Sequence, residues 1–209
     1  MIKCVLFDLD GVLVDACDWH YESLNRALDN VAGFTISKTD HESTYNGLPT
    51  RTKLAMLVDS GHLDETQTSR IWELKQEYTV DVIQEKAGID VTKVLLHKSL
   101  QDRRLQIGCV TNSIRKTAEL MLKNTGQLDM LDLLVTNEDV NKPKPSPEGY
   151  QKALAYFNLR PEEVLIFEDS EKGMHAAIES GAFVVQVQNA TEVLPTFVLS
   201  IIDQLEDME

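Results

Sequence analysis

Short apolar runs recur along the chain, and segments with helical spacing of apolar positions separate most of them. Five runs are predominantly apolar, as expected of strands buried on both faces: 2–7, 105–110, 133–136, 164–167 and 183–187. Amphipathic patterns typical of helices follow the second, third and fourth runs, at 113–123, 147–157 and 171–180. This alternation predicts a doubly wound α/β fold with a parallel, Rossmann-like sheet. A sixth short strand is expected near 198–202, and the acidic end 203–209 is expected to fray.

The first interval between apolar runs is much longer than the others and contains no comparable run. Helical patterns dominate it, at 19–30, 50–59, 65–84 and 91–103. The last of these has the position of a crossover helix of the sheet. We therefore predict two domains: an α/β core formed by residues 1–15 and 87–209, and an inserted helical domain formed by residues 16–86.

Acidic residues outnumber basic ones by 34 to 20, which gives a formal net charge of −14. Such a chain repels phosphate backbones, so nucleic acid is not an expected partner, whereas cations such as Mg²⁺ are favoured. No run approaches the roughly 18 apolar residues of a membrane span, so no membrane partner is expected. Three widely spaced cysteines predict neither a disulfide framework nor a zinc site. A reducing cytoplasm is the expected location.

Polar residues follow four of the five apolar runs. They are Asp8 and Asp10, Thr111 and Asn112, Lys144, and Glu168 and Asp169. Because parallel strands bring their carboxyl ends to one rim of the sheet, we expect these groups to converge there. Carboxylates, a hydroxyl and a lysine together are typical of metal-assisted phosphoryl transfer.

Each of these groups has a predicted role in that reaction. Asp8, held at the end of a strand, is the expected nucleophile, and Asp10, two residues on, is the expected general acid and base. The hydroxyl of Thr111 and the backbone N–H of Asn112 precede a helix and are expected to bind the phosphoryl group. Lys144 is expected to pair with Asp8 and with that group.

The expected cofactor is Mg²⁺, which takes hard oxygen ligands. Asp8 and Asp169 are the predicted carboxylate ligands, with Glu168 in support. A calcium loop is a poorer interpretation of the Asp8–Asp10 motif, because Gly11 stands at the fourth position of such a loop rather than the sixth, and Trp19 replaces its bidentate Glu.

Four motifs resemble those of the haloacid dehalogenase (HAD) superfamily: 7–15, 111–113, 144–147 and 167–170. The resemblance is to the branch with a helical C1 cap, which contains β-phosphoglucomutase, phosphoglycolate phosphatase and sugar-phosphate phosphatases. It implies a Rossmann-like core, Mg²⁺ dependence and a further Mg²⁺ ligand in the backbone carbonyl of Asp10. The family's spacing from the motif lysine to the next helical aromatic fits Lys144 and Tyr150, with Lys142 as the alternative.

The inserted domain is expected to select the substrate. Segment 46–53 resembles the substrate-specificity loop of the cap, and Arg51 within it is a candidate for binding an anionic group or sugar hydroxyls. His20 and Lys75 resemble cap positions that face the substrate in the mutase branch. The alternative for all three residues is an ordinary exposed position on a helix.

Three functions remain open at this point. The first is a Mg²⁺-dependent phosphatase of a small phosphorylated metabolite, with sugar phosphates as candidates, that acts through an aspartyl-phosphate. The second is a phosphomutase similar to β-phosphoglucomutase, and the third is a binding module with a vestigial catalytic core. A dehalogenase is disfavoured because Asp10 serves phosphoryl chemistry.

Overall fold

The computed structural model describes residues 1–207, and the chain divides into two compact units. One unit combines Met1–Asp15 with the chain from Gly88 onward, and the other is Ala16–Ala87. Among the helices of residues 1–207, none has both the length and the apolar character that crossing a membrane requires.

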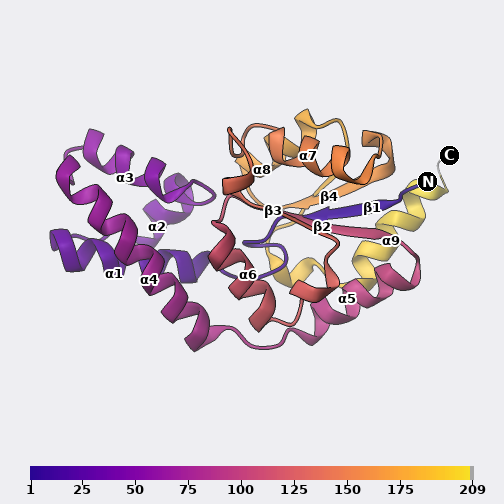
Figure 1. Ribbon diagram of the computed structural model, residues 1–209, viewed down its shortest axis with the longest axis horizontal. Helices are drawn as coiled ribbons and strands as arrows, with labels where there is room; N and C mark the ends of the chain where they lie inside the picture. The colour runs from indigo at the N-terminus through magenta and orange to yellow at the C-terminus, as the bar shows by residue number, and fades with distance from the viewer. Residues whose placement is uncertain (208–209) are drawn as a thin grey trace. The chain divides into compact units, whose positions relative to one another are not determined.

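The first unit is built on a parallel sheet (Figure 1), and its strand order is β3-β2-β1-β4-β5. The strands are β1 (Cys4–Phe7), β2 (Gln106–Val110), β3 (Leu133–Val135), β4 (Val164–Glu168) and β5 (Phe183–Gln186). Phe7, the last residue of β1, lies beside Cys109 of β2 and Phe167 of β4. The residue that follows β1 therefore leaves the sheet at the centre of its carboxyl edge.

Helices cover both faces of this sheet, so the predicted doubly wound α/β fold is confirmed. α7 and α8 lie on one face and α5, α6 and α9 on the other (Figure 1). Their bounds are α5 (Val91–Asp102), α6 (Arg115–Asn124), α7 (Glu148–Phe157), α8 (Glu171–Glu179) and α9 (Pro195–Glu206). Single 3-10 turns span Leu128–Met130, Asn137–Asp139, Pro161–Glu163 and Ala190–Glu192.

The predicted sixth strand near 198–202 is wrong, because this segment lies inside α9. Val198 and Ile202 are its buried residues, and their spacing of four places both on one face of a helix. Pro195 at the first turn supports the helix start. The helix continues to Glu206, so the frayed end is also wrong for 203–206, while residues 208–209 lie outside the described part of the chain.

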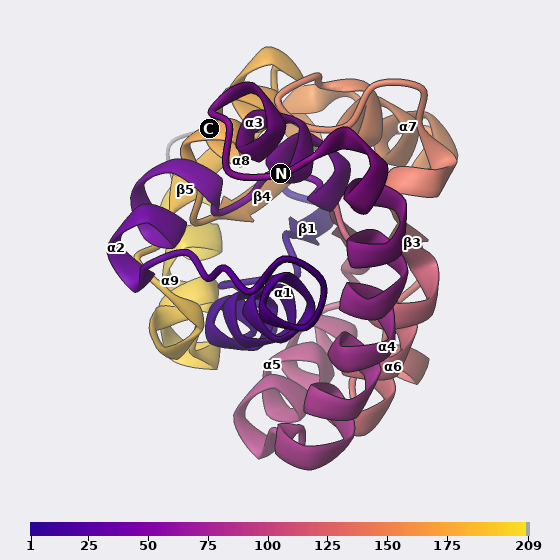
Figure 2. The ribbon, with the colours of Figure 1, turned by 90° about the vertical axis from the view of Figure 1, so that its left-hand side faces the viewer.

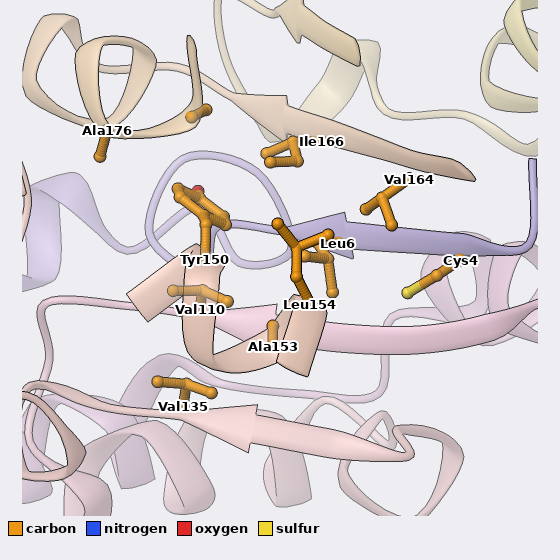
Figure 3. Close-up of a cluster of buried hydrophobic side chains, with 11 residues drawn as sticks. Cys4, Leu6, Val110, Val135, Tyr150, Ala153, Leu154, Val164, Ile166 and Ala176 are labelled. Atoms are coloured by element: carbon orange, nitrogen blue, oxygen red, sulfur yellow. The ribbon is translucent and has the colours of Figure 1, made fainter. Parts of the chain in front are cut away.

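The strands alternate their side chains between the two faces. Cys4 and Leu6 of β1 join a buried cluster with Tyr150 and Leu154 of α7 (Figure 3). Phe7 points to the other face, where its ring stacks on Phe167 at 5.5 Å between centroids. Continuing the alternation, Asp8 falls on the same side of the sheet as Leu6 and Tyr150.

The second unit is helical and has an apolar core of its own. Its helices are α1 (Cys17–Ala32), α2 (Lys38–Asp40), α3 (Thr50–Asp59) and α4 (Thr68–Lys86), with a π-helical turn at His41–Tyr45 and a 3-10 turn at Glu65–Gln67. α1 packs against α4 (Figure 2). The core of this unit contains Leu24 and Leu28 of α1, Leu54 and Leu57 of α3, and Ile71 of α4.

A buried lysine ties α5 to the segment before α9. Lys93 lies in the first turn of α5, and its Nζ donates hydrogen bonds to the carbonyl oxygens of Ala190 at 2.6 Å and Val193 at 3.0 Å. Burial lowers the pKa of Lys93, although the nearby carboxylate of Asp90 opposes this shift. The ammonium of Lys93 thus supplies donors to the carbonyl groups of the first residue of the 190–192 turn and of the residue that follows it.

We predict that Lys93→Met destabilises the first unit, because the carbonyl groups of Ala190 and Val193 lose a buried donor. The expected cost is about 1–3 kcal/mol of the free energy of unfolding, measured by urea denaturation. Lys98→Met, at an exposed position of the same helix, is the control and should change stability little. Equal stabilities of the two variants would contradict this role of Lys93.

Candidate active site

Asp8 directly follows the central strand and is 7% exposed. Its backbone N–H donates to the carbonyl of Phe167 at 3.0 Å, so the sheet ladder extends to this residue and fixes its backbone. After Asp8 the chain makes a tight turn in which the N–H groups of Leu13 and Val14 donate to the carbonyl of Leu9 at 3.0 and 2.9 Å. The turn carries Asp10, which is half-buried.

Gly11 is the residue that allows this turn to approach the end of β4. Its φ is +92°, and a Cβ at this position would lie 2.1 Å from Oδ2 of Asp169. Any other residue would strain the backbone and collide with that carboxylate. The glycine therefore lets Asp169 lie directly against the turn that carries Asp10.

Lys144 connects the carboxylates of the site. Its Nζ donates to Oδ1 of Asp8 at 2.6 Å, to Oε1 of Glu168 at 2.6 Å and to the carbonyl of Val110 at 2.7 Å. An ammonium has three N–H donors, so all of them are in use. Lys144 is 6% exposed, whereas Lys142, the alternative for the motif lysine, is exposed.

Burial and the neighbouring charges together shift the pKa values of Asp8 and Lys144. Burial raises the pKa of Asp8; the charge of Lys144 opposes the rise, and Glu168, Asp169 and Asp10 add to it, with a net upward shift. Burial also lowers the pKa of Lys144, but the charges of Asp8 and Glu168 outweigh it, so this pKa lies above its usual value. Lys144 is therefore positively charged at neutral pH.

Glu168 is fully buried, and hydrogen bonds hold both of its oxygens. Oε1 accepts from Lys144 Nζ and from the hydroxyl of Tyr150 at 2.7 Å, and Oε2 accepts from the backbone N–H of Asp169 at 3.2 Å. A Cβ at Gly173 would lie 2.0 Å from Oε2, so this glycine leaves the room that the carboxylate fills. Glu168 thus orients Lys144.

Three carboxylates form a group that could hold a cation. Asp8, Glu168 and Asp169 each offer an oxygen within 4.8 Å of the others. Oδ1 of Asp169 is buried and has no hydrogen-bond partner. Burial, followed by the charges of Glu168 and Asp10, raises the pKa of Asp169 to about 7. An unpartnered buried oxygen beside two further carboxylates fits the hard oxygen donors that Mg²⁺ prefers.

The residues after β2 line the same rim. Thr111 is buried, and its Oγ1 accepts from the backbone N–H of Ser113 at 2.9 Å. The side chain of Asn112 accepts from the backbone N–H of Lys144 at 2.9 Å and donates to the carbonyl of Lys144 at 3.1 Å. Asn112 therefore holds the backbone of the lysine. Ser113 Oγ donates to Oδ2 of Asp10 at 2.8 Å.

Sequence reasoning assigned no site role to three residues that the structure brings in. Ser113 orients Asp10, Tyr150 orients Glu168, and Gly173 makes room for Glu168. The position of Ser113 directly after Thr111 and Asn112 was an available signal. The family's spacing from the motif lysine singled out Tyr150 as the next helical aromatic, but nothing local revealed what its hydroxyl contacts.

The three predicted substrate residues of the helical unit lie in two different settings. Lys75 is buried, and its Nζ lies 3.2 Å from Nδ1 of His20, so these two residues are together. Arg51 is exposed, and its guanidinium lies over the ring of Trp72, 4.7 Å from the centroid. The contact with Trp72 restricts the orientation of Arg51.

His41, which the sequence analysis did not select, is 2% exposed, and neither of its ring nitrogens has a hydrogen-bond partner. Burial, followed by the charges of Lys53 and His20, lowers its pKa to about 4. This imidazole is therefore neutral at physiological pH.

Sequence relatives of known name cover most of the chain. Validoxylamine A 7'-phosphate phosphatase of Streptomyces hygroscopicus subsp. limoneus is 34% identical over 188 residues, which are 88% of this chain and 85% of the relative. Phosphorylated carbohydrates phosphatase of Thermotoga maritima is 27% identical, with 86% of this chain and 82% of the relative aligned. Pyrophosphatase PpaX of Anoxybacillus flavithermus is 29% identical, with 86% and 80% aligned.

Solved structures share the fold over nearly the whole chain. β-Phosphoglucomutase from Clostridium difficile superposes with a TM-score of 0.83 and 23% identity, covering 100% of this chain and 98% of that one. At this identity the likeness concerns the fold alone. A sequence model of the haloacid dehalogenase-like hydrolases matches residues 5–187. By this match and by the 34% identical relative, the chain belongs to the haloacid dehalogenase-like hydrolase family.

Proposed function

We propose that this enzyme is a Mg²⁺-dependent phosphatase that hydrolyses a small phosphorylated metabolite through an aspartyl-phosphate on Asp8. The observation that carries the proposal is the ion pair between Lys144 and Asp8 within the carboxylate group of Asp8, Glu168 and Asp169. The names of two relatives, a validoxylamine phosphate phosphatase and a phosphorylated carbohydrates phosphatase, favour a sugar phosphate as the substrate.

In the first step, a carboxylate oxygen of Asp8 attacks the phosphorus atom, and the bond to the leaving oxygen breaks. Lys144, which donates to Asp8 Oδ1, balances negative charge on the carboxylate and on the phosphoryl group. The hydroxyl of Thr111 and the backbone N–H of Asn112 bind phosphoryl oxygens. The sheet ladder through Asp8 keeps the nucleophile in place, which limits the entropy lost in reaching the transition state.

Asp10 moves the proton in both steps. It protonates the leaving oxygen as the first bond breaks, and it then takes a proton from the water that attacks the aspartyl-phosphate. The hydrogen bond from Ser113 Oγ orients its carboxyl group. Water attack at phosphorus releases inorganic phosphate and restores the carboxylate of Asp8.

Asp8 and Asp169 would hold Mg²⁺ together with the backbone carbonyl of Asp10, and Glu168 would support them. Bound Mg²⁺ would supply positive charge that offsets the repulsion between these carboxylates and an incoming phosphate. In the helical unit, His20, Arg51 and Lys75 are the proposed contacts for the leaving group. Lys75 and His20 act as a pair in this proposal, because their polar atoms lie 3.2 Å apart.

We predict that Asp8→Asn lowers the turnover of p-nitrophenyl phosphate with Mg²⁺ by roughly a thousandfold or more, because an amide is a poor nucleophile. Incubation with a radiolabelled substrate should label the wild-type protein in a hydroxylamine-sensitive form and leave Asp8→Asn unlabelled. Asp129→Asn, at an exposed position, is the control. Undiminished turnover by Asp8→Asn would refute the proposal that Asp8 is the nucleophile.

We predict that Mg²⁺ stabilises the wild-type protein through Asp169. At about a hundred times its dissociation constant, Mg²⁺ should raise the melting temperature by roughly 5–10 °C. Asp169→Asn should lose most of this shift, because it removes a charged ligand next to Asp8 and Glu168. Thermal denaturation with and without Mg²⁺ measures the effect independently of activity, with Asp129→Asn as the control. If Mg²⁺ raised the melting temperature of Asp169→Asn as much as that of the wild type, Asp169 would not be a ligand of the ion.

The second candidate function is a phosphomutase, in which a hydroxyl of the bound sugar receives the phosphoryl group from Asp8. The pairing of His20 with Lys75 keeps this candidate open, because both positions resemble substrate contacts of the mutase branch. We predict that the enzyme, incubated with β-glucose 1-phosphate and Mg²⁺, releases inorganic phosphate rather than forming glucose 6-phosphate. Dominant formation of glucose 6-phosphate would favour the mutase, and a screen of other phosphomonoesters would then identify the preferred leaving group.

A further inference from the structure

A buried polar network lies behind the turn that carries Asp10. Its centre is Gln127, which is 0% exposed and follows α6. Its Nε2 donates to the carbonyl of Leu13 at 3.1 Å and to Oγ1 of Thr125 at 2.9 Å. Its Oε1 lies 3.0 Å from Nε2 of His97 on α5. The side chain of Gln127 thus links two helical segments to the loop after β1.

These contacts fix the orientation of every group in the network. Because the amide nitrogen of Gln127 donates twice, its oxygen must face His97, and His97 must donate from Nε2. His97 is completely buried, and its ring packs edge-on against Phe7 at 5.9 Å between centroids. Phe7 immediately precedes Asp8. His97 therefore orients Gln127 while it packs against the strand that leads to the nucleophile.

The carbonyl that Gln127 holds belongs to the turn of residues 9–14. Within this turn, the N–H of Gly11 donates to the carbonyl of Val14 at 2.8 Å, and Leu13 itself is completely buried. Asp10 therefore sits on a loop whose shape depends on a few hydrogen bonds. Ser113 holds the carboxyl group of Asp10, and Gln127 holds the backbone from the opposite end of the turn.

We propose that Gln127, oriented by His97, is a positioning residue that fixes the 9–14 turn and thereby sets the geometry of proton transfer by Asp10. This inference rests on the proposed role of Asp10 as general acid. A displacement of about 1 Å is enough to impair such a transfer severely. Asp8, which directly follows β1, keeps its place because its backbone N–H donates a hydrogen bond to the carbonyl of Phe167. The proton-transfer step should therefore depend on Gln127 more than the attack by Asp8 does.

The decisive variant is Gln127→Met, which keeps the length of the side chain and removes its hydrogen bonds. Two substrates separate the steps: glycerol 2-phosphate has an alkoxide leaving group that needs a proton, and p-nitrophenyl phosphate has a leaving group that needs little help. We expect Gln127→Met to lower kcat/KM for glycerol 2-phosphate about tenfold more than for p-nitrophenyl phosphate. Equal reductions of kcat/KM for the two substrates would indicate a structural defect alone and would overturn the proposal.

Two further variants keep this comparison interpretable. Ser180→Ala removes another buried side-chain donor of the same unit, whose hydroxyl donates to the carbonyl of Ala177 in α8, and should change both substrates by the same factor. His97→Phe keeps a ring against Phe7 but leaves Gln127 unoriented, and should shift the substrate ratio in the same direction as Gln127→Met. If Gln127→Met fails to fold, His97→Phe serves as the test variant in its place.

Hydrogen exchange tests the anchoring without any activity. The amides of Leu13 and Val14 should exchange about tenfold faster in Gln127→Met than in the wild type, and at the wild-type rate in Ser180→Ala. Unchanged exchange in Gln127→Met and His97→Phe would overturn the proposal. If the wild-type protein hydrolyses neither substrate with Mg²⁺, the proposed phosphatase function fails, and exchange alone then decides whether Gln127 holds the turn.

Discussion

The site depends on one buried ammonium group shared by two carboxylates. Lys144 donates to Asp8 and Glu168 at 2.6 Å each, and its third donor is satisfied by a backbone carbonyl. Without this charge, the close approach of Asp8, Glu168 and Asp169 would be prohibitive in a buried setting. When ionised, three carboxylates and one ammonium leave two negative charges, which is the charge that a divalent cation would offset. The same contacts therefore stabilise the ionised carboxylate of Asp8, the proposed nucleophile, and leave a net charge that suits a divalent cation.

Much of the fold could be predicted because buried parallel strands leave a strong pattern of short apolar runs between helices. The failure at 198–202 has a simple physical reason. Five apolar or small residues can form a strand or one side of a helix, and only the packing of Val198 and Ile202 on the same face decides between them. Pro195 is a local signal for a helix start that the apolar run alone does not contain.

The candidate site was predictable only in part, because strand ends converge but hydrogen bonds do not follow from sequence. The rule for parallel sheets was enough to expect Asp8 beside Lys144. It could not tell that Glu168 accepts hydrogen bonds from Lys144 and Tyr150, which lie 24 and 18 residues away in the chain. The contact of Gln127 with the carbonyl of Leu13 spans 114 residues, and Gln127 lies outside all four motifs.

The site also depends on two glycines, because it needs empty space as much as it needs functional groups. A Cβ at position 11 would meet Asp169 at 2.1 Å, and a Cβ at position 173 would meet Glu168 at 2.0 Å. With hydrogen in those places, both carboxylates lie against the backbone, which removes Glu168 from water completely and Asp169 in part. That desolvation is the main cause of the raised pKa of Asp169, and it also strengthens any attraction to a cation. The glycines thus bring acidic residues into a setting where a bound cation would relieve an electrostatic cost that folding imposes.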